Sequence, residues 1–162
     1  MNDLGVKSIM VDTSYCIRLM DKSDALHPNA LDYFKYCLLN KISLHVSTIA
    51  IAEYAVDDNP ANLPLNNFQI EAFDFLDAKI AGSFHREIRG SQTNIPNYNR
   101  RIIANDVKML AQISNKNIEA IISKDVASFR QYIQPLTAAN LLNIKFFDLN
   151  TPLNSILGQL FT

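Results

Sequence analysis

The 162-residue sequence contains no tryptophan, only two cysteines and four glycines, and no strong excess of either charge. So few glycines, with only six prolines, argue against a disordered or low-complexity chain. Hydrophobic residues make up 48% of the sequence, which is typical of a globular protein. A chain of this length is expected to form one domain, residues 1–162, that buries roughly 70% of its unfolded surface.

Several classes of protein are disfavoured by what is missing. Cys16 and Cys37 lack the close Cys or His spacing of a zinc or redox site, so we expect two reduced, buried thiols. No apolar run approaches the roughly 20 residues that span a bilayer, and the N-terminus lacks the basic-then-apolar order of a signal peptide. These absences predict a soluble, cytoplasmic protein. With a net charge of −1, any nucleic-acid partner needs a local cluster of Lys and Arg.

Strand-like and helix-like segments alternate along the chain. Apolar runs that suit strands occupy residues 8–11, 42–47, 68–73, 120–122 and 144–149. Helical spacing of apolar residues occupies residues 15–20, 28–38, 49–56, 74–89, 107–113, 129–133 and 152–161, with the fifth helix ending at a 115–117 turn and the sixth before Pro135. Breaker-rich segments at 57–67 and 90–99 predict loops. The first run does not alternate, which suits a strand of a parallel sheet covered by helices, and the chain is therefore expected to be α/β.

Acids follow two of the expected strands. Asp12 directly follows the run Ser8–Val11, and in open α/β sheets ligands bind at this carboxyl edge. Asp12 is also an ordinary N-cap for the next helix, and taken alone it suits either role equally. The late run Ala120–Ile122 ends in a hydroxyl and an acid as well, Ser123 and Asp125. This recurrence is harder to explain by capping and favours a site.

Glu53 and Asp106 each lie near the start of a helix that follows the sheet, where they could face the same cleft. The neighbours of Glu53 are apolar or small, which indicates an acid in a largely buried helix, and such an acid is costly unless paired or metal-bound. Asp106 alone is more simply explained as a cap or a surface charge. Together, converging carboxylates repel one another unless a hard divalent cation joins them. Mg²⁺ or Mn²⁺ fits better than Zn²⁺ because His and Cys ligands are lacking, and His45 is expected at a strand edge or the surface.

The order and spacing of these motifs resemble the PIN domain, the nuclease fold of VapC-type toxins. The resemblance covers nearly the whole chain and rests on Asp12-Thr13-Ser14, Val46-Ser47 followed by Glu53, Asp106, and Ser123-Lys124-Asp125 with Phe129. It implies a three-layer α/β/α fold with a central parallel sheet. It also implies a metal-dependent ribonuclease site made by Asp12, Glu53, Asp106 and Asp125.

The resemblance implies roles and partners as well. Asp12 and Asp125 would be direct ligands of Mg²⁺ or Mn²⁺, Asp106 a direct or water-mediated ligand, and Glu53 a ligand or the group that orients the water. Ser14 and Ser123 would be supporting hydroxyls near the metal. The substrate would be RNA, and toxin-like relatives typically pair with a small antitoxin and form homodimers. The one basic concentration of the chain would hold the RNA backbone: Arg86, Arg89, Arg100 and Arg101.

Two positions depart from the usual pattern of the family. Ser128 stands where members often carry a further acid, and Lys108 occupies a place that is commonly apolar. Ser128 supports an alternative in which a catalytically weak or inactive PIN-like domain acts by binding RNA or a partner protein. A phosphatase with an aspartyl nucleophile would also place an acid after the first strand, but it usually needs a second Asp where this chain has Ser14.

Overall fold

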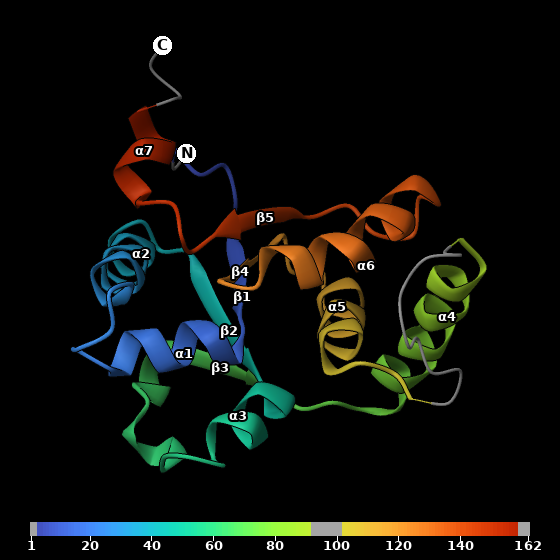
Figure 1. Ribbon diagram of the computed structural model, residues 1–162, viewed down its shortest axis with the longest axis horizontal. Helices are drawn as coiled ribbons and strands as arrows, with labels where there is room; N and C mark the ends of the chain where they lie inside the picture. The colour runs from blue at the N-terminus through green and yellow to red at the C-terminus, as the bar shows by residue number, and fades with distance from the viewer. Residues whose placement is uncertain (1–2, 92–101, 159–162) are drawn as a thin grey trace.

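The computed structural model describes residues 3–91 and 102–158 (Figure 1). Within these residues one sheet contains the strands β1 (Ser8–Val11), β2 (Ser43–Ser47), β3 (Phe68–Glu71), β4 (Ala120–Ser123) and β5 (Lys145–Asp148). The strand order is β3-β2-β1-β4-β5, and every neighbouring pair is parallel. The expected α/β fold with a central parallel sheet is confirmed.

Helices cover both faces of this sheet, as Figure 1 shows. They are α1 (Thr13–Met20), α2 (His27–Leu39), α3 (Thr48–Tyr54), α4 (Phe75–Ser91), α5 (Asn105–Asn115), α6 (Val126–Ala138) and α7 (Leu153–Gly158). Helices α1 and α2 pack together on one face, and α4, α5 and α6 pack together on the other. The layers are therefore helix, sheet and helix.

The central strands β1 and β4 explain why the sheet forms here. Ile9, Met10 and Val11 are fully buried, and so are Ile121 and Ile122, because helices cover both sides of these strands. The chain leaves β1 toward β2 on one side, whereas β4 lies on its other side and is reached only after α4 and α5. The strand order thus reverses beside β1, which is where a crevice for ligands opens in sheets of this kind.

Some boundaries differ from those expected. Helix α6 runs through Pro135 instead of ending before it, because Phe129, Tyr132 and Leu136 continue the buried stripe past the proline. Helix α4 includes Gly90, which was expected to open a loop. The segment 57–67 contains two 3₁₀ turns, Pro60–Asn62 and Leu65–Asn67. Residues 92–99 of the other expected loop and 159–161 of the last helix lie outside the described residues.

The expectation for His45 is wrong. His45 lies on the interior strand β2 and is buried, and its Nδ1 is 2.7 Å from Oε1 of Glu71 at the end of β3. The carboxylate satisfies the ring nitrogen, so a histidine is tolerated in the sheet. Cys16 and Cys37 are free and buried, as expected. Among the described residues, no helix has the length and apolar character needed to cross a membrane.

Candidate active site

Asp12 lies at the carboxyl edge of the sheet, between β1 and β4. Val11 of β1 is in register with Ile122 of β4, so the next residues, Asp12 and Ser123, are neighbours at this edge. Asp12 is 3% exposed, and its Oδ1 accepts a 2.9 Å hydrogen bond from the backbone N–H of Tyr15, which caps α1. A single side chain thus fills both roles that the sequence left open, the helix cap and the carboxylate at the edge.

Two serine hydroxyls hold the Asp12 carboxylate. Ser14 Oγ lies 2.7 Å from Oδ1 and Ser123 Oγ lies 2.5 Å from Oδ2, each donating a hydrogen bond. The same hydroxyls accept hydrogen bonds from backbone N–H groups, Ser14 from Lys124 at 3.0 Å and Ser123 from Asp125 at 2.9 Å. The structure therefore brings Asp12, Ser14 and Ser123 together and joins the start of α1 to the end of β4.

Burial changes the acidity of Asp12. Desolvation raises the pKa of Asp12 from 3.8 to about 6, the hydrogen bonds from Ser123, Ser14 and the Tyr15 backbone oppose this rise, and the charge of Asp125 adds to it. A buried carboxylate whose pKa is raised in this way is a candidate for function, because the fold has kept a charge that costs stability.

Asp106 lies in the first turn of α5 and is half-buried. Its Oδ2 accepts a 2.5 Å hydrogen bond from Ser128 Oγ of α6. Burial raises the pKa of Asp106, the Ser128 hydrogen bond lowers it, and the charges of Glu53 and Asp125 raise it further. Because Asp125 also acts on Asp12, electrostatic repulsion connects all four of the predicted acids.

The expectation that Glu53 is buried is wrong. Helix α3 is short and buries only Ala50 and Tyr54, and Glu53 is exposed on another face. Its carboxylate accepts hydrogen bonds from Thr13 Oγ1 at 3.2 Å and from Asn105 Nδ2 at 2.9 Å. These bonds hold Glu53 between the start of α1 and the start of α5, so tertiary contacts, and not burial of its helix, place its charge near Asp106.

Three polar residues hold the predicted acids by hydrogen bonds, a role that was not predicted for them from the sequence. Thr13 and Asn105 hold Glu53, and Ser128 holds Asp106. Thr13 and Asn105 each lie next to a predicted acid in the chain, which was the available signal. Ser128 gave no such signal, because its partner is 22 residues away on another helix.

The side chains of this site offer oxygen atoms, which are the ligands that a hard cation prefers. All four acids offer oxygen, whereas His45 pairs with Glu71 and His27 Nδ1 contacts the backbone oxygen of Arg18. Within residues 3–91 and 102–158, no three acids, histidines or cysteines already stand at the spacing of a metal site. A cation would therefore have to draw the four carboxylates closer, against the mutual repulsion that its charge removes.

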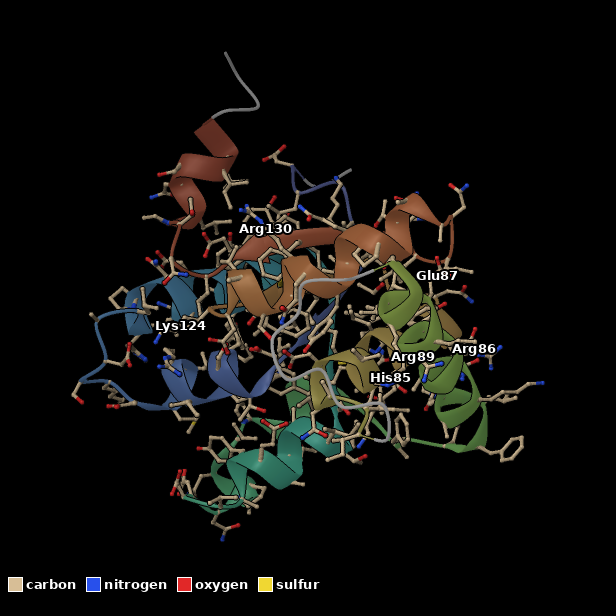
Figure 2. The ribbon with its side chains drawn as sticks, turned by 45° about the vertical axis from the view of Figure 1, so that its right-hand side comes forward. His85, Arg86, Glu87, Arg89, Lys124 and Arg130 are labelled. Atoms are coloured by element: carbon tan, nitrogen blue, oxygen red, sulfur yellow. The ribbon has the colours of Figure 1, made fainter. Side chains whose placement is uncertain are left out.

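Of the predicted basic residues, Arg86 and Arg89 do not contact these acids. Arg86 and Arg89 are exposed on α4, and in Figure 2 they lie well away from Lys124, which directly precedes Asp125. No ion pair between the described side chains connects Arg86 or Arg89 to any of the four acids. Arg100 and Arg101 lie outside the described residues.

Solved structures of similar architecture identify the fold. VapBC2 from Rickettsia felis, bound to a promoter DNA fragment, matches with a TM-score of 0.60 over 87% of this chain and 99% of that chain, at 16% identity. The chain has a PIN-like fold. FitAcB from Neisseria gonorrhoeae matches this PIN-like fold with a TM-score of 0.61 at 15% identity, covering 87% and 97% of the two chains.

A third match supports the same conclusion. VapBC-1 from nontypeable Haemophilus influenzae has a TM-score of 0.59 at 16% identity, covering 89% of this chain and 99% of that chain. No protein-family model and no curated protein matches the sequence. The similarity is therefore a similarity of fold. The PIN-like fold that the motifs predicted is confirmed.

Replacing Ser128 with Ala is expected to destabilise the metal-free protein by about 1–2 kcal/mol at pH 8, because the ionised Asp106 loses a charge-assisted hydrogen bond. The loss should be smaller at pH 4, where a protonated Asp106 needs the donor less. Urea unfolding at both pH values measures this, with Ser83→Ala on the exposed face of α4 as the matched control. An equal loss at both pH values would mean that Ser128 acts by packing alone.

Proposed function

We propose that the chain is a metal-dependent endoribonuclease that hydrolyses RNA phosphodiester bonds at Asp12, Glu53, Asp106 and Asp125. The observation that carries this proposal is the buried Asp12 carboxylate, which Ser14 and Ser123 hold at the carboxyl edge of a PIN-like fold. Burial and neighbouring carboxylates raise the pKa of both Asp12 and Asp106. A fold that gathers uncompensated carboxylates at its ligand-binding edge is suited to a divalent cation.

Each side chain has a part in the proposed reaction. Asp12, Asp106 and Asp125 would hold Mg²⁺ or Mn²⁺, which when bound neutralises phosphate charge and lowers the pKa of a bound water. Ser14 and Ser123 fix both oxygens of Asp12, so that its carboxylate keeps one orientation. Glu53 is exposed and is held from two helices, which suits a group that orients the attacking water or accepts its proton.

We further propose that this activity belongs to a toxin that a small antitoxin neutralises. The support is the PIN-like fold shared with VapBC and FitAB complexes, three of which were solved bound to DNA. An antitoxin gene is then expected beside this one, and a gene that stands alone would count against the toxin role. A homodimer is proposed on the same resemblance, and a monomer by light scattering at high concentration would contradict it.

The proposal is tested by incubating the full chain with a structured RNA in Mn²⁺, in Mg²⁺ and in excess EDTA. Cleavage is expected with either metal and should be lost in EDTA, then return when the metal is restored. The control variant is Asp32→Asn, which removes an exposed acid of α2 outside the site and should cleave like the wild type. Cleavage that persists in EDTA would rule out a metal-dependent reaction.

A second candidate function is RNA or protein binding without catalysis. Two observations favour it: Ser128 replaces an acid that the family often carries, and the described acids do not yet stand at metal-site spacing. RNA binding by the wild type in Mn²⁺, with no cleavage over many hours, would favour this candidate over the nuclease.

A further inference from the structure

Lys108 lies at the candidate site and has no part in the roles proposed above. It is half-buried on α5, one turn after Asn105, and its Nζ lies 3.5 Å from the amide oxygen of Asn105. The amide nitrogen of Asn105 in turn donates to Glu53 Oε1 at 2.9 Å. One neutral amide therefore joins the ammonium group of Lys108 to the carboxylate of Glu53.

No carboxylate among the described residues pairs with the charge of Lys108. Within the described parts of the chain its one side-chain partner is the neutral Asn105 oxygen, and it forms no ion pair with a carboxylate, although four acids share the site. An ammonium group has three N–H donors, so two remain for a ligand. A half-buried cation beside an acidic site is placed to bind an anion that enters it.

Acidic side chains line the other flank of Glu53. A hollow of about 290 Å³ opens between α1 and α3, and its lining includes three further acids, Asp21, Asp57 and Asp58. No Lys or Arg of the described residues lines this hollow. Lys108 does not line this hollow and is connected to Glu53 through Asn105 at the start of α5. The acidic lining disfavours the approach of an RNA strand along the α1 side of Glu53.

We infer that Lys108 binds a backbone phosphate of the RNA strand where that strand enters the site over the start of α5. This inference rests on the proposed nuclease function and extends it, because it names the residue that offsets the repulsion between RNA and the carboxylates. The contact is to phosphate and so carries no base specificity. Asn105 keeps the ammonium beside Glu53, which sets the phosphate next to the catalytic acids.

The test compares Lys108→Gln with Lys35→Gln, which removes the same charge from an exposed position of α2 on the opposite face of the sheet. Binding of a fluorescent single-stranded RNA is measured by anisotropy, with both changes made in an Asp12→Asn chain so that cleavage does not interfere. Lys108→Gln is expected to weaken binding about 5- to 10-fold and to lower the salt slope of log K by about 0.7, the value for one phosphate contact on a single strand.

Further variants separate a phosphate contact from a structural role. Lys108→Arg keeps the charge and should bind RNA within about twofold of the parent. Circular dichroism and thermal unfolding show whether Lys108→Gln is folded, and if it is not, Lys108→Met, which keeps a long side chain without the charge, takes its place in the same comparison with Lys35→Gln. Equal RNA affinity and salt slope for Lys108→Gln and Lys35→Gln would overturn the inference.

The two proposals fail in different ways. If the wild-type chain does not cleave RNA in Mn²⁺ but Lys108→Gln still weakens binding, the nuclease function fails and the phosphate contact stands. If the wild type cleaves and Lys108→Gln binds and cleaves equally well, the nuclease stands and the phosphate contact fails.

Discussion

Replacing Asp12 with Asn is expected to lower RNA cleavage by about 10³-fold or more while leaving the protein folded. The amide that replaces the carboxylate carries no charge and offers one oxygen in place of two, so it is a poor ligand for a hard cation. The affinity for Mn²⁺ should also fall strongly. Calorimetric titration of Mn²⁺ into wild type and Asp12→Asn, beside the RNA assay, measures both.

The fold should tolerate this change because Asn is as good an N-cap as Asp. The amide oxygen can still accept from the Tyr15 N–H, as Oδ1 does now. The rise in the pKa of Asp12 from 3.8 to about 6 means that its ionised form costs about 3 kcal/mol of stability at neutral pH. Removing that charge offsets the loss of the Ser123 hydrogen bond, so the unfolding temperature at pH 7.5 should stay equal or rise.

Asp32→Asn on the exposed face of α2 is the matched control and should change neither cleavage nor Mn²⁺ binding. An Asp12→Asn chain that cleaves RNA like the wild type would return Asp12 to the role of a helix cap. If the Asp12→Asn chain loses both its fold and its activity, Asp12→Ser is tested in its place, since Ser is also a good N-cap.

The affinity for Mn²⁺ is expected to fall about tenfold between pH 7.5 and pH 5. A cation binds the ionised carboxylates, and the pKa of Asp12 is raised to about 6, so at pH 5 a proton must leave before the metal binds. Asp106, whose pKa is also raised, adds to the same trend. Calorimetry in two buffers of different ionisation enthalpy measures the affinity and the number of protons released.

The stability of the metal-free protein should change with pH in the opposite direction from the Mn²⁺ affinity. Asp12 and Asp106 hold protons more tightly when folded than when unfolded, so their contribution is most favourable below pH 3.8 and is lost as pH rises through the raised pKa values. Added Mn²⁺ should therefore raise the unfolding temperature more at pH 7.5 than at pH 5. A Mn²⁺ affinity that does not change between these pH values would contradict the assignment of Asp12 as a ligand.

Much of the fold was predictable because its signals are local. A non-alternating apolar run such as Ser8–Val11 can only be satisfied by cover on both faces, and a parallel sheet gives its strands that cover. Helix positions followed from apolar spacing. In the structure Ser47 caps α3, since its hydroxyl accepts a hydrogen bond from the Ile49 N–H. The end of α6 was missed because Leu136, beyond Pro135, gains its burial from other parts of the chain.

The sequence by itself determined which residue types are available for chemistry: acids that follow strands or open helices, with neighbouring hydroxyls, and no Cys or His set for zinc. The positions of Asp12 and Asp125 directly after β1 and β4 placed them at one edge of the sheet because parallel strands end together, whereas Asp106 opens the helix α5. The spacing of apolar residues could not predict whether Glu53 is buried, because its burial depends on which face of α3 meets the sheet.

Only the tertiary structure decided how these groups hold one another. Ser123 and Ser128 bond to acids 111 and 22 residues away in the chain, and Asn105 joins Glu53 to Lys108. Such pairs depend on the packing of whole helices against the sheet, to sub-ångström precision, and no local pattern encodes that. The physical reason is that hydrogen bonds act over about 3 Å, whereas sequence patterns fix only which face of an element is buried.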